Sequence, residues 1–478
     1  MKARRAHRCR LAVTLTLAMA LGGCATAPPE ASAPWVHAEV NRRLPPGAAS
    51  TEPPAPLSDT ALREALAQPL DADAAVRLAL RQHPSVHARL HRLGVAEAEA
   101  WQALQWPNPG LSLGRLSQGG ALSWEAGLHL DLVRLLMRPQ RQRVESAKLQ
   151  AERRQAAAEL LRWAHATRRA WVQAVAAQEA WRYQRQVMDA AEASAELARR
   201  MEAVGNFNAL QRAREQTFLA EAALGLARAE QRRHQSRERL VRQLGLWGES
   251  VDALKLPDRL PPLPATPPPS AGLEARALRE RLDIDAARWT LTQSQADADL
   301  VRGTRWVDAL ALGRNWHRGH DEPTETGWTL SLALPVFDGA GPRVARAQAL
   351  QAQRLQELAA LALQARSEVR EADLRLQHAH DIARLHRDAL LPLRQRIADE
   401  QLLRYNGMLT GVFELLADTR AQIQAVASTI DALEAYWLAQ TDLDQALIGS
   451  PGASGAEPHA APTASSSSPS HAAVTAPH

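Results

Sequence analysis

The feature that most constrains the fold is a long segment without helix breakers. Between Pro139 and Gly205 the sequence contains neither Gly nor Pro, and these ~65 residues would form a helix of about 98 Å at 1.5 Å per residue. Pro342 to Gly407 repeats nearly this length, interrupted only by Pro392, where we expect a kink. Apolar or small residues recur at steps of three, four or seven, at Ala157, Leu161, Ala164, Trp171 and Val175. This spacing predicts coiled-coil-like packing, and alone it does not exclude a plain cytoskeletal-style coiled coil.

Composition agrees with long helices and argues against a nucleic-acid partner. Of the 478 residues, 46% are hydrophobic, mostly Ala and Leu, and only 4% are aromatic, which favours long helices over a thick aromatic core. The formal net charge of +5 comes from five basic residues before position 11, and removing residues 1–23 leaves 52 basic against 52 acidic residues. A neutral mature chain offers no electrostatic basis for binding a polyanion.

The N-terminus is typical of a secreted lipoprotein. The basic residues precede an apolar run from Leu11 to Leu21, which is long enough for a signal peptide and too short to span a bilayer. Leu21-Gly22-Gly23-Cys24 resembles the bacterial lipobox, which implies cleavage after residue 23 and covalent lipid on Cys24; Ala25 in place of Asp implies sorting to the outer membrane. The only other cysteine, Cys9, would be lost with the signal, so no disulfide is expected.

The remaining sequence contains two similar copies of one arrangement of elements. Ala79-Leu80-Arg81 recurs as Ala277-Leu278-Arg279, and each copy continues through a Trp, an alternating stretch and two long helical segments. The expected divisions are the signal peptide 1–23, an acylated extended segment 24–70, a first repeat 71–255, a Pro-rich linker 256–272, a second repeat 273–449 and a disordered tail 450–478.

Each copy also contains an alternating stretch that predicts a β-strand facing lipid. Apolar residues at every second position, with small or polar residues between them, match a transmembrane strand. Weaker partner strands lie at 111–116 and 306–316, and Arg115, Asp308 and Arg314 fall on their apolar side, so we expect these three near a rim. The alternative is a pair of solvated hairpins on a soluble protein. The predicted lipid-facing residues are Leu122, Trp124, Leu128, Leu130, Trp328, Leu330, Leu332 and Leu334.

Closure of such strands requires several chains. No segment of 18 consecutive apolar residues exists, so helices are not expected to cross the membrane. Four strands cannot close a barrel, and open sheet edges are not tolerated in lipid, whereas three chains would supply 12 strands. The predicted fold class is therefore mainly α with a small β part: a tandem-repeat, long-helix coiled-coil barrel with four transmembrane β-strands per chain, completed as a 12-stranded barrel in a trimer.

Enzyme chemistry finds no support in the sequence. It contains no HExxH, no phosphate-binding P-loop, no G-x-S-x-G and no Cys pair. His378 and His380 would diverge by about 200° on a helix and cannot chelate one metal together. We expect no enzymatic activity, no metal and no cofactor apart from the covalent lipid.

Taken together, these residues resemble the TolC family of outer-membrane efflux ducts, and its OprM-like lipoprotein branch in particular. The resemblance covers nearly all of 24–449 and includes Cys24, Asn108-Pro109, the segment 334–339 after the last strand, and Tyr405-Asn406-Gly407. It implies a homotrimer in the outer membrane that projects into the periplasm and works with a periplasmic adaptor protein and an inner-membrane pump. The sequence does not identify the exported substrate.

The resemblance also implies two functional sites. The tips of the helical hairpins would meet the adaptor, with a glycine permitting the chain reversal and a polar residue capping the next helix. Glu414 and Asp418, one helical turn apart, would form a carboxylate ring at the periplasmic gate of a trimer, although Asp418 is shifted by one position from the family's second acid. The predicted tip residues are Val204, Gly205, Asn206, Asn208, Asn406, Gly407 and Thr410.

Two functions are compatible with this sequence. The first is the passive efflux duct. The second is a lipid-anchored periplasmic coiled-coil adaptor or spacer that does not span the outer membrane. Two similar hairpins and two amphipathic β-pairs favour the duct, because an adaptor would be expected to show one helical hairpin flanked by β-domains.

Overall fold

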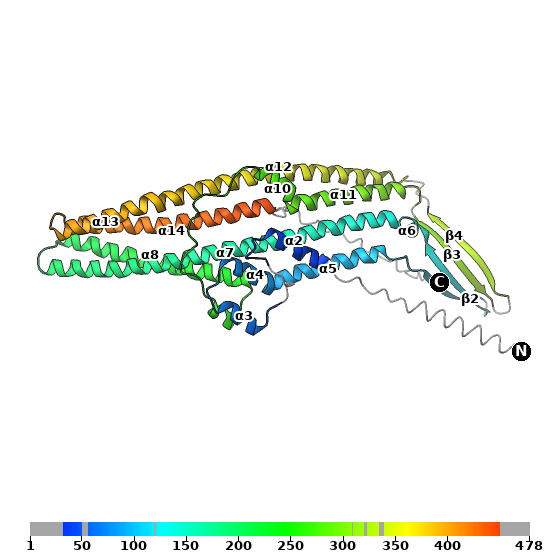
Figure 1. Ribbon diagram of the computed structural model, residues 1–478. Coiled ribbons are helices and arrows are strands. Elements are labelled where there is room, and N and C mark those ends of the chain that lie inside the picture. The colour runs from blue at the N-terminus through cyan, green and yellow to red at the C-terminus, as the bar shows by residue number, and fades with distance from the viewer. Residues whose placement is uncertain are drawn as a thin grey trace, which may run out of the picture.

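The computed structural model describes residues 32–49, 56–118, 121–307, 309–319, 323–333 and 339–449. The molecule is a long helical body with a small sheet at one end and two helical tips at the other (Figure 1). Cys24, the predicted signal peptide and the predicted tail lie outside the described residues. The expected fold class, mainly α with a small β part, is confirmed.

The segment without Gly or Pro forms one continuous helix. It is α7, Arg138–Ala203, and its 66 residues correspond to about 99 Å. The predicted seam residues Ala157, Leu161, Ala164, Trp171 and Val175 are all buried. Helix α8, Ala209–Leu244, packs along the tip half of α7, whereas α5, Pro84–Leu104, and α11, Leu282–Gly303, pack along it nearer the sheet.

The second hairpin is interrupted near Pro392, as the sequence predicts. Helix α12, Gly341–Leu385, passes into a π-helical turn, His386–Leu390, before α13 begins at Leu391 and continues to Asn406. The proline has no N–H to donate, and its ring disfavours regular α-geometry in the preceding turn, so the extra residue of a π-turn accommodates it. Helix α14, Val412–Ile448, returns along α12 and α13.

The N-terminal segment and the linker contribute to the core. The predicted segment 24–70 contains α2, Ser32–Arg43, whose Val36 and Val40 are buried against α7, and α3, Asp59–Leu66. Helix α4, Ala72–Gln82, with α9, Glu249–Ala253, completes a lobe on the side of the body. The linker runs from α9 to α10, Leu273–Glu280, and its carbonyl groups at Pro261, Leu263 and Pro264 accept hydrogen bonds from Trp437, Arg387 and His380, respectively.

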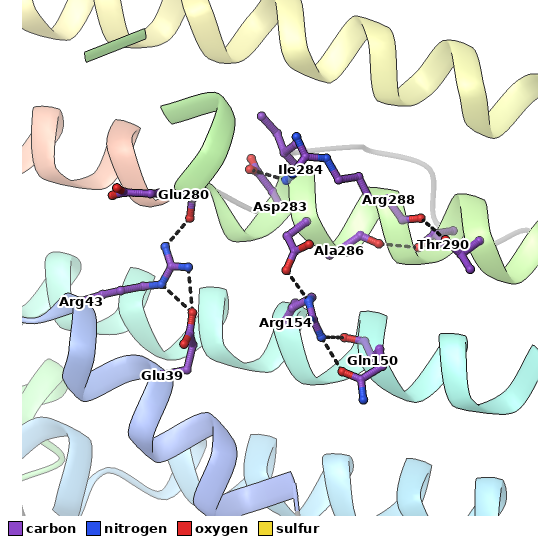
Figure 2. Close-up of polar contacts among 12 residues, drawn as sticks. Glu39, Arg43, Gln150, Arg154, Glu280, Asp283, Ile284, Ala286, Arg288 and Thr290 are labelled. Atoms are coloured by element: carbon purple, nitrogen blue, oxygen red, sulfur yellow. Dashed lines mark hydrogen bonds and ion pairs between the residues drawn. The ribbon is translucent and has the colours of Figure 1, made fainter. Parts of the chain in front are cut away.

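Arginines connect the N-terminal helix and the two repeats near the middle of the helical body. Arg43 of α2 donates hydrogen bonds to Glu39 and to the carbonyl of Glu280, and Arg154 of α7 pairs with Asp285 of α11 and donates a hydrogen bond to the Gln150 side chain (Figure 2). These contacts link segments that are more than 100 residues apart in the sequence, so they fix the relative position of the two halves.

The strands form one four-stranded antiparallel sheet in the order β1-β2-β3-β4. Their bounds are Gly110–Gln118, Ala121–Asp131, Ala309–Arg318 and Glu325–Ala333, so Trp306 precedes β3 rather than opening it. A short helix α6, Leu132–Leu136, connects β2 to α7. The two hairpin ends point away from the helical body (Figure 1).

Candidate functional site

The sheet has one apolar face and one polar face. In the register, Leu111 is opposite Leu128, Leu130 is opposite Leu312, and Leu312 is opposite Leu330, so leucines from all four strands share a face. This face is largely uncovered: Leu113 is 74% exposed, Trp328 70% and Leu330 65%. An exposed apolar surface of this extent indicates a surface for lipid or protein rather than for water.

The predicted lipid-facing residues come together on this face. Trp124, Leu128 and Leu332 are exposed there, and Leu130 is half-buried. The side chain of Leu122 and the whole of Leu334 lie outside the described residues, as does Asp308.

The expectation that the arginines of the apolar parity lie near a rim is wrong for Arg314. This residue is in the middle of β3, where it is paired with Leu128 on one side and Trp328 on the other. Its guanidinium lies 5.1 Å from the centre of the Trp328 ring and 5.7 Å from that of Trp316. The two indole rings provide cation–π contacts for this guanidinium.

The opposite face carries the acidic residues of the strands, which the sequence analysis did not assign to a site. Glu125 of β2 faces His317 of β3 at 3.4 Å between Oε1 and Nδ1, and Glu325 of β4 is the next partner in the same row. Asp131 has the same parity as Glu125, and Asn315 donates a hydrogen bond to Thr329 on this face. Alternation combined with the sign of each charge could have identified them, because all three acids of the strands share this parity.

The first helical tip has the predicted turn chemistry. Gly205 has φ +80°, the left-handed region that glycine adopts without strain. Asn208 caps α8 by accepting a hydrogen bond from the Gln211 N–H, and the Gln211 side chain accepts one from the Asn208 N–H. Val204 is 70% exposed, and Asn206 is exposed beside it.

The second tip differs from the prediction at two positions. Gly407 has φ −79°, and the left-handed position is occupied instead by Met408, with φ +56°. Thr410 does not cap the next helix, because Gly411 is the N-cap and the Thr410 hydroxyl is buried without a hydrogen-bond partner among the described residues. The turn lies one residue later than the glycine suggests, and Met408 is 94% exposed there. Asn406 ends α13.

The two acidic residues of the predicted gate lie beyond this tip on α14. Glu414 is exposed and Asp418 is half-buried, and the described residues provide neither with an ion pair. Arg420 is two residues further on, about 200° around the helix from Asp418, and it points toward α8. The acidic pair therefore lies on the side of α14 away from the first hairpin.

Ion pairs with buried carboxylates connect the two hairpins. Near the tips, the buried Glu215 of α8 accepts a hydrogen bond from Arg420 of α14 at 2.9 Å and one from Ser194 of α7 at 2.7 Å. Further from the tips, Arg232 of α8 pairs with Glu434 of α14, whose pKa is raised because burial disfavours the carboxylate. These pairs hold the second hairpin against the first.

Two features are absent from the described part of the chain. There, no group of three His, Cys, Asp or Glu side chains is placed to hold a metal ion. None of the described helices has both the length and the apolar character to cross a bilayer.

The fold is that of bacterial outer-membrane channels. A membrane protein from Pseudomonas aeruginosa has a TM-score of 0.69 at 20% identity, with 84% of this chain and 99% of that chain covered. The open-state MtrE outer membrane channel of Neisseria gonorrhoeae has a TM-score of 0.68 at 17% identity, covering 80% and 90%. The outer membrane protein VceC of Vibrio cholerae has 0.67 at 14% identity, covering 80% and 97%.

At these identities the likeness concerns the fold. No protein-family model and no curated protein matches the sequence. The TolC-type fold predicted from the sequence resemblance is confirmed by these structures.

Proposed function

We propose that the chain is the outer-membrane duct of an efflux system, working as a homotrimer. The observation that carries this proposal is the two-faced sheet at one end of a helical body about 100 Å long. Its apolar face is suited to hydrocarbon and its polar face to a water-filled lumen. Three copies would complete the sheet into a 12-stranded barrel, and the helices would continue the lumen through the periplasm. Substrate would move passively, with energy supplied by an inner-membrane pump.

The polar face supports a preference for cations within the barrel lumen. Glu125, Asp131 and Glu325 give nine carboxylates in a trimer, and the described strands place no Lys or Arg on this face. A ring of carboxylates attracts cations and repels anions.

The test is the reversal potential of the purified protein in a planar bilayer under a salt gradient. We expect the wild type to prefer cations and the Glu125→Gln, Asp131→Asn, Glu325→Gln variant to lose most of that preference. The matched control removes three acids of the side lobe, with Asp59→Asn, Glu64→Gln and Glu249→Gln, and should behave as wild type. Absence of ion conductance in every preparation would count against the duct and favour a periplasmic spacer.

We further propose that Glu414 and Asp418 line the periplasmic constriction and that the two tips bind an adaptor protein. The proposal is supported by the lack of described ion pairs for the two acids and by the exposure of Val204 and Met408. Neutralising both acids, with Glu414→Gln and Asp418→Asn, should change ion selectivity and gating while leaving trimer formation intact. Unchanged selectivity would remove the acids from the gate.

Attachment through a lipid on Cys24 is part of the same proposal, and it rests on the lipobox resemblance. Mass spectrometry of the N-terminal peptide should find an acylated cysteine, including palmitate, at the new N-terminus. The Cys24→Ser variant should lack the acyl mass. An unmodified Cys24 in the mature protein would contradict the anchor.

A further inference from the structure

The charges of the strands are segregated by face. Arg115, Arg314 and Arg318 all lie on the apolar face, whereas Glu125, Asp131 and Glu325 all lie on the polar face. A face with seven or more leucines and tryptophans would be expected to exclude charge, so three arginines there require a partner. We call Arg115, Arg314 and Arg318, with Trp124 between them, the arginine patch.

Arg115 and Arg318 lie toward the hairpin ends of the sheet, whereas Arg314 lies in the middle of β3. Arg115, Trp124 and Arg318 form one row across β1, β2 and β3, since Trp124 is paired with both arginines. Arg318 is the last residue of β3, and Arg115 is three residues from the end of β1. Arg314 is four residues closer to the helical body, and its guanidinium lies 5.7 Å from the centre of the ring of Trp316, which is one row closer to Arg115 and Arg318.

No carboxylate of the described chain neutralises these arginines. All three side chains are exposed, and none forms an ion pair with a described residue. Two of them contact aromatic rings: Arg115 lies 5.6 Å from the centre of the Trp124 ring, and Arg314 lies over Trp328 and Trp316. Such rings hold the guanidinium planes without consuming their five N–H donors.

The position of the patch on a lipid-facing surface indicates which anion it would bind. An arginine on the lipid face is unfavourable at the bilayer midplane and becomes tolerated near the interface, where its long side chain can reach the headgroups. At that level the available anions are lipid phosphates, and guanidinium binds phosphate through two parallel hydrogen bonds. Tryptophan is likewise enriched at the membrane interface.

We propose that the arginine patch binds the phosphate of an anionic lipid headgroup in the outer leaflet. The proposal rests on the proposed function, which puts the apolar face in the membrane with the hairpin ends outward. The bound lipid would complete the charge balance of this face and seal the protein against the surrounding leaflet.

The experiment measures lipid binding by the full-length protein in detergent, separately from conductance. The probes are lipid A carrying two phosphates, the same lipid A with its phosphates removed, and inorganic phosphate alone. Bound lipid is counted by native mass spectrometry, and the unfolding midpoint is followed during each titration. The variants are the triple Arg→Gln and the triple Arg→Lys at positions 115, 314 and 318. The matched control is Arg214→Gln, Arg279→Gln and Arg396→Gln, three exposed helical arginines.

We expect phosphorylated lipid A to bind and stabilise the wild type and the control. Each arginine near an anionic headgroup contributes about fivefold in affinity, so the triple Gln variant should need at least about tenfold more lipid. The triple Lys variant should retain part of the binding because it keeps the charge and loses the paired hydrogen bonds.

Equal binding of phosphorylated lipid A by the triple Gln variant would overturn the proposal. So would equal binding of the dephosphorylated lipid, or an equal stabilisation by inorganic phosphate alone. A wild type that binds the lipid in detergent and never conducts in a bilayer would contradict the proposed duct while supporting the patch, so the two failures are distinguishable.

Discussion

The buried pair between Glu215 and Arg420 gives the sharpest test of how the two hairpins are held together. The Glu215 side chain is 2% exposed and has only Ser194 and Arg420 as polar partners in the described chain. Arg420 is 37% exposed, and its guanidinium also lies 4.4 Å from the centre of the Phe218 ring. Removing the arginine therefore leaves a buried carboxylate without its cation, whereas removing the acid leaves an arginine that water can reach.

The two single variants should consequently differ in cost. Breaking a buried pair by removing one partner costs about 3–5 kcal/mol, and partial exposure of Arg420 lowers the expectation for Arg420→Met to about 2–3 kcal/mol. Glu215→Gln keeps a hydrogen-bonding group beside Ser194 and should cost about 1 kcal/mol. The double variant Glu215→Leu, Arg420→Met should cost less than the sum of Glu215→Leu and Arg420→Met measured separately, because the double variant leaves no buried charge unpaired.

Hydrogen exchange at the tip halves of α7, α8 and α14 provides the assay. A loss of about 2–3 kcal/mol corresponds to local opening that is roughly 30- to 150-fold more frequent. The matched control is Arg404→Met, which removes an exposed partner of Glu400 near the same tip and should change stability by less than about 0.5 kcal/mol. Equal, small effects of Arg420→Met and Arg404→Met would show that the Glu215–Arg420 pair does not hold the hairpins together.

Two further predictions concern stability. His165 is 7% exposed and its Nε2 has no described partner, so burial lowers its pKa to about 4 from 6.5. Because the unfolded state then binds the proton more readily, the stabilisation from neutral His165 is complete above pH 6.5 and is lost as pH falls toward 4. Between pH 7.5 and pH 5 the free energy of unfolding of the wild type should fall by about 2 kcal/mol more than that of His165→Leu. Thermal unfolding at each pH measures this difference. Met408→Gly should relieve the left-handed backbone of the second tip and slow hydrogen exchange there, with a gain of about 0.5–1 kcal/mol; faster exchange in that variant would contradict the strain.

Much of the architecture could be predicted because it depends on local rules. The absence of Gly and Pro between 139 and 205 sets the length of α7, and Pro392 sets the position of the irregular turn. Period-two alternation was sufficient to locate β2 and β4, since register places every second residue on the same face. Each of these elements is specified by residues that lie within a few positions of one another in the sequence.

The parts that could not be predicted depend on contacts between distant segments. The burial of Val36 and Val40 requires α7 beside them, and the three linker carbonyls find their donors on α12, the π-helical turn and α14. At the second tip the glycine suggested a left-handed turn at position 407, but the helix continues to Asn406 and the reversal falls on Met408. Arg314 was expected near a rim because it falls on the apolar side of its strand, and its pairing with Trp328 of β4 becomes visible only in the register.

In the proposed duct, the apolar face of the sheet lies in hydrocarbon and the polar face lines a lumen. Substitutions at Leu330 and Ser331 distinguish the two faces, because these residues are adjacent in β4 and point to opposite sides of the sheet. An arginine on the lipid face near the midplane costs about 2–4 kcal/mol in each protomer. In planar-bilayer recordings, Leu330→Arg should abolish channel insertion, whereas Ser331→Arg should insert and conduct with a weaker cation preference. Normal insertion and unchanged conductance of Leu330→Arg would contradict the account.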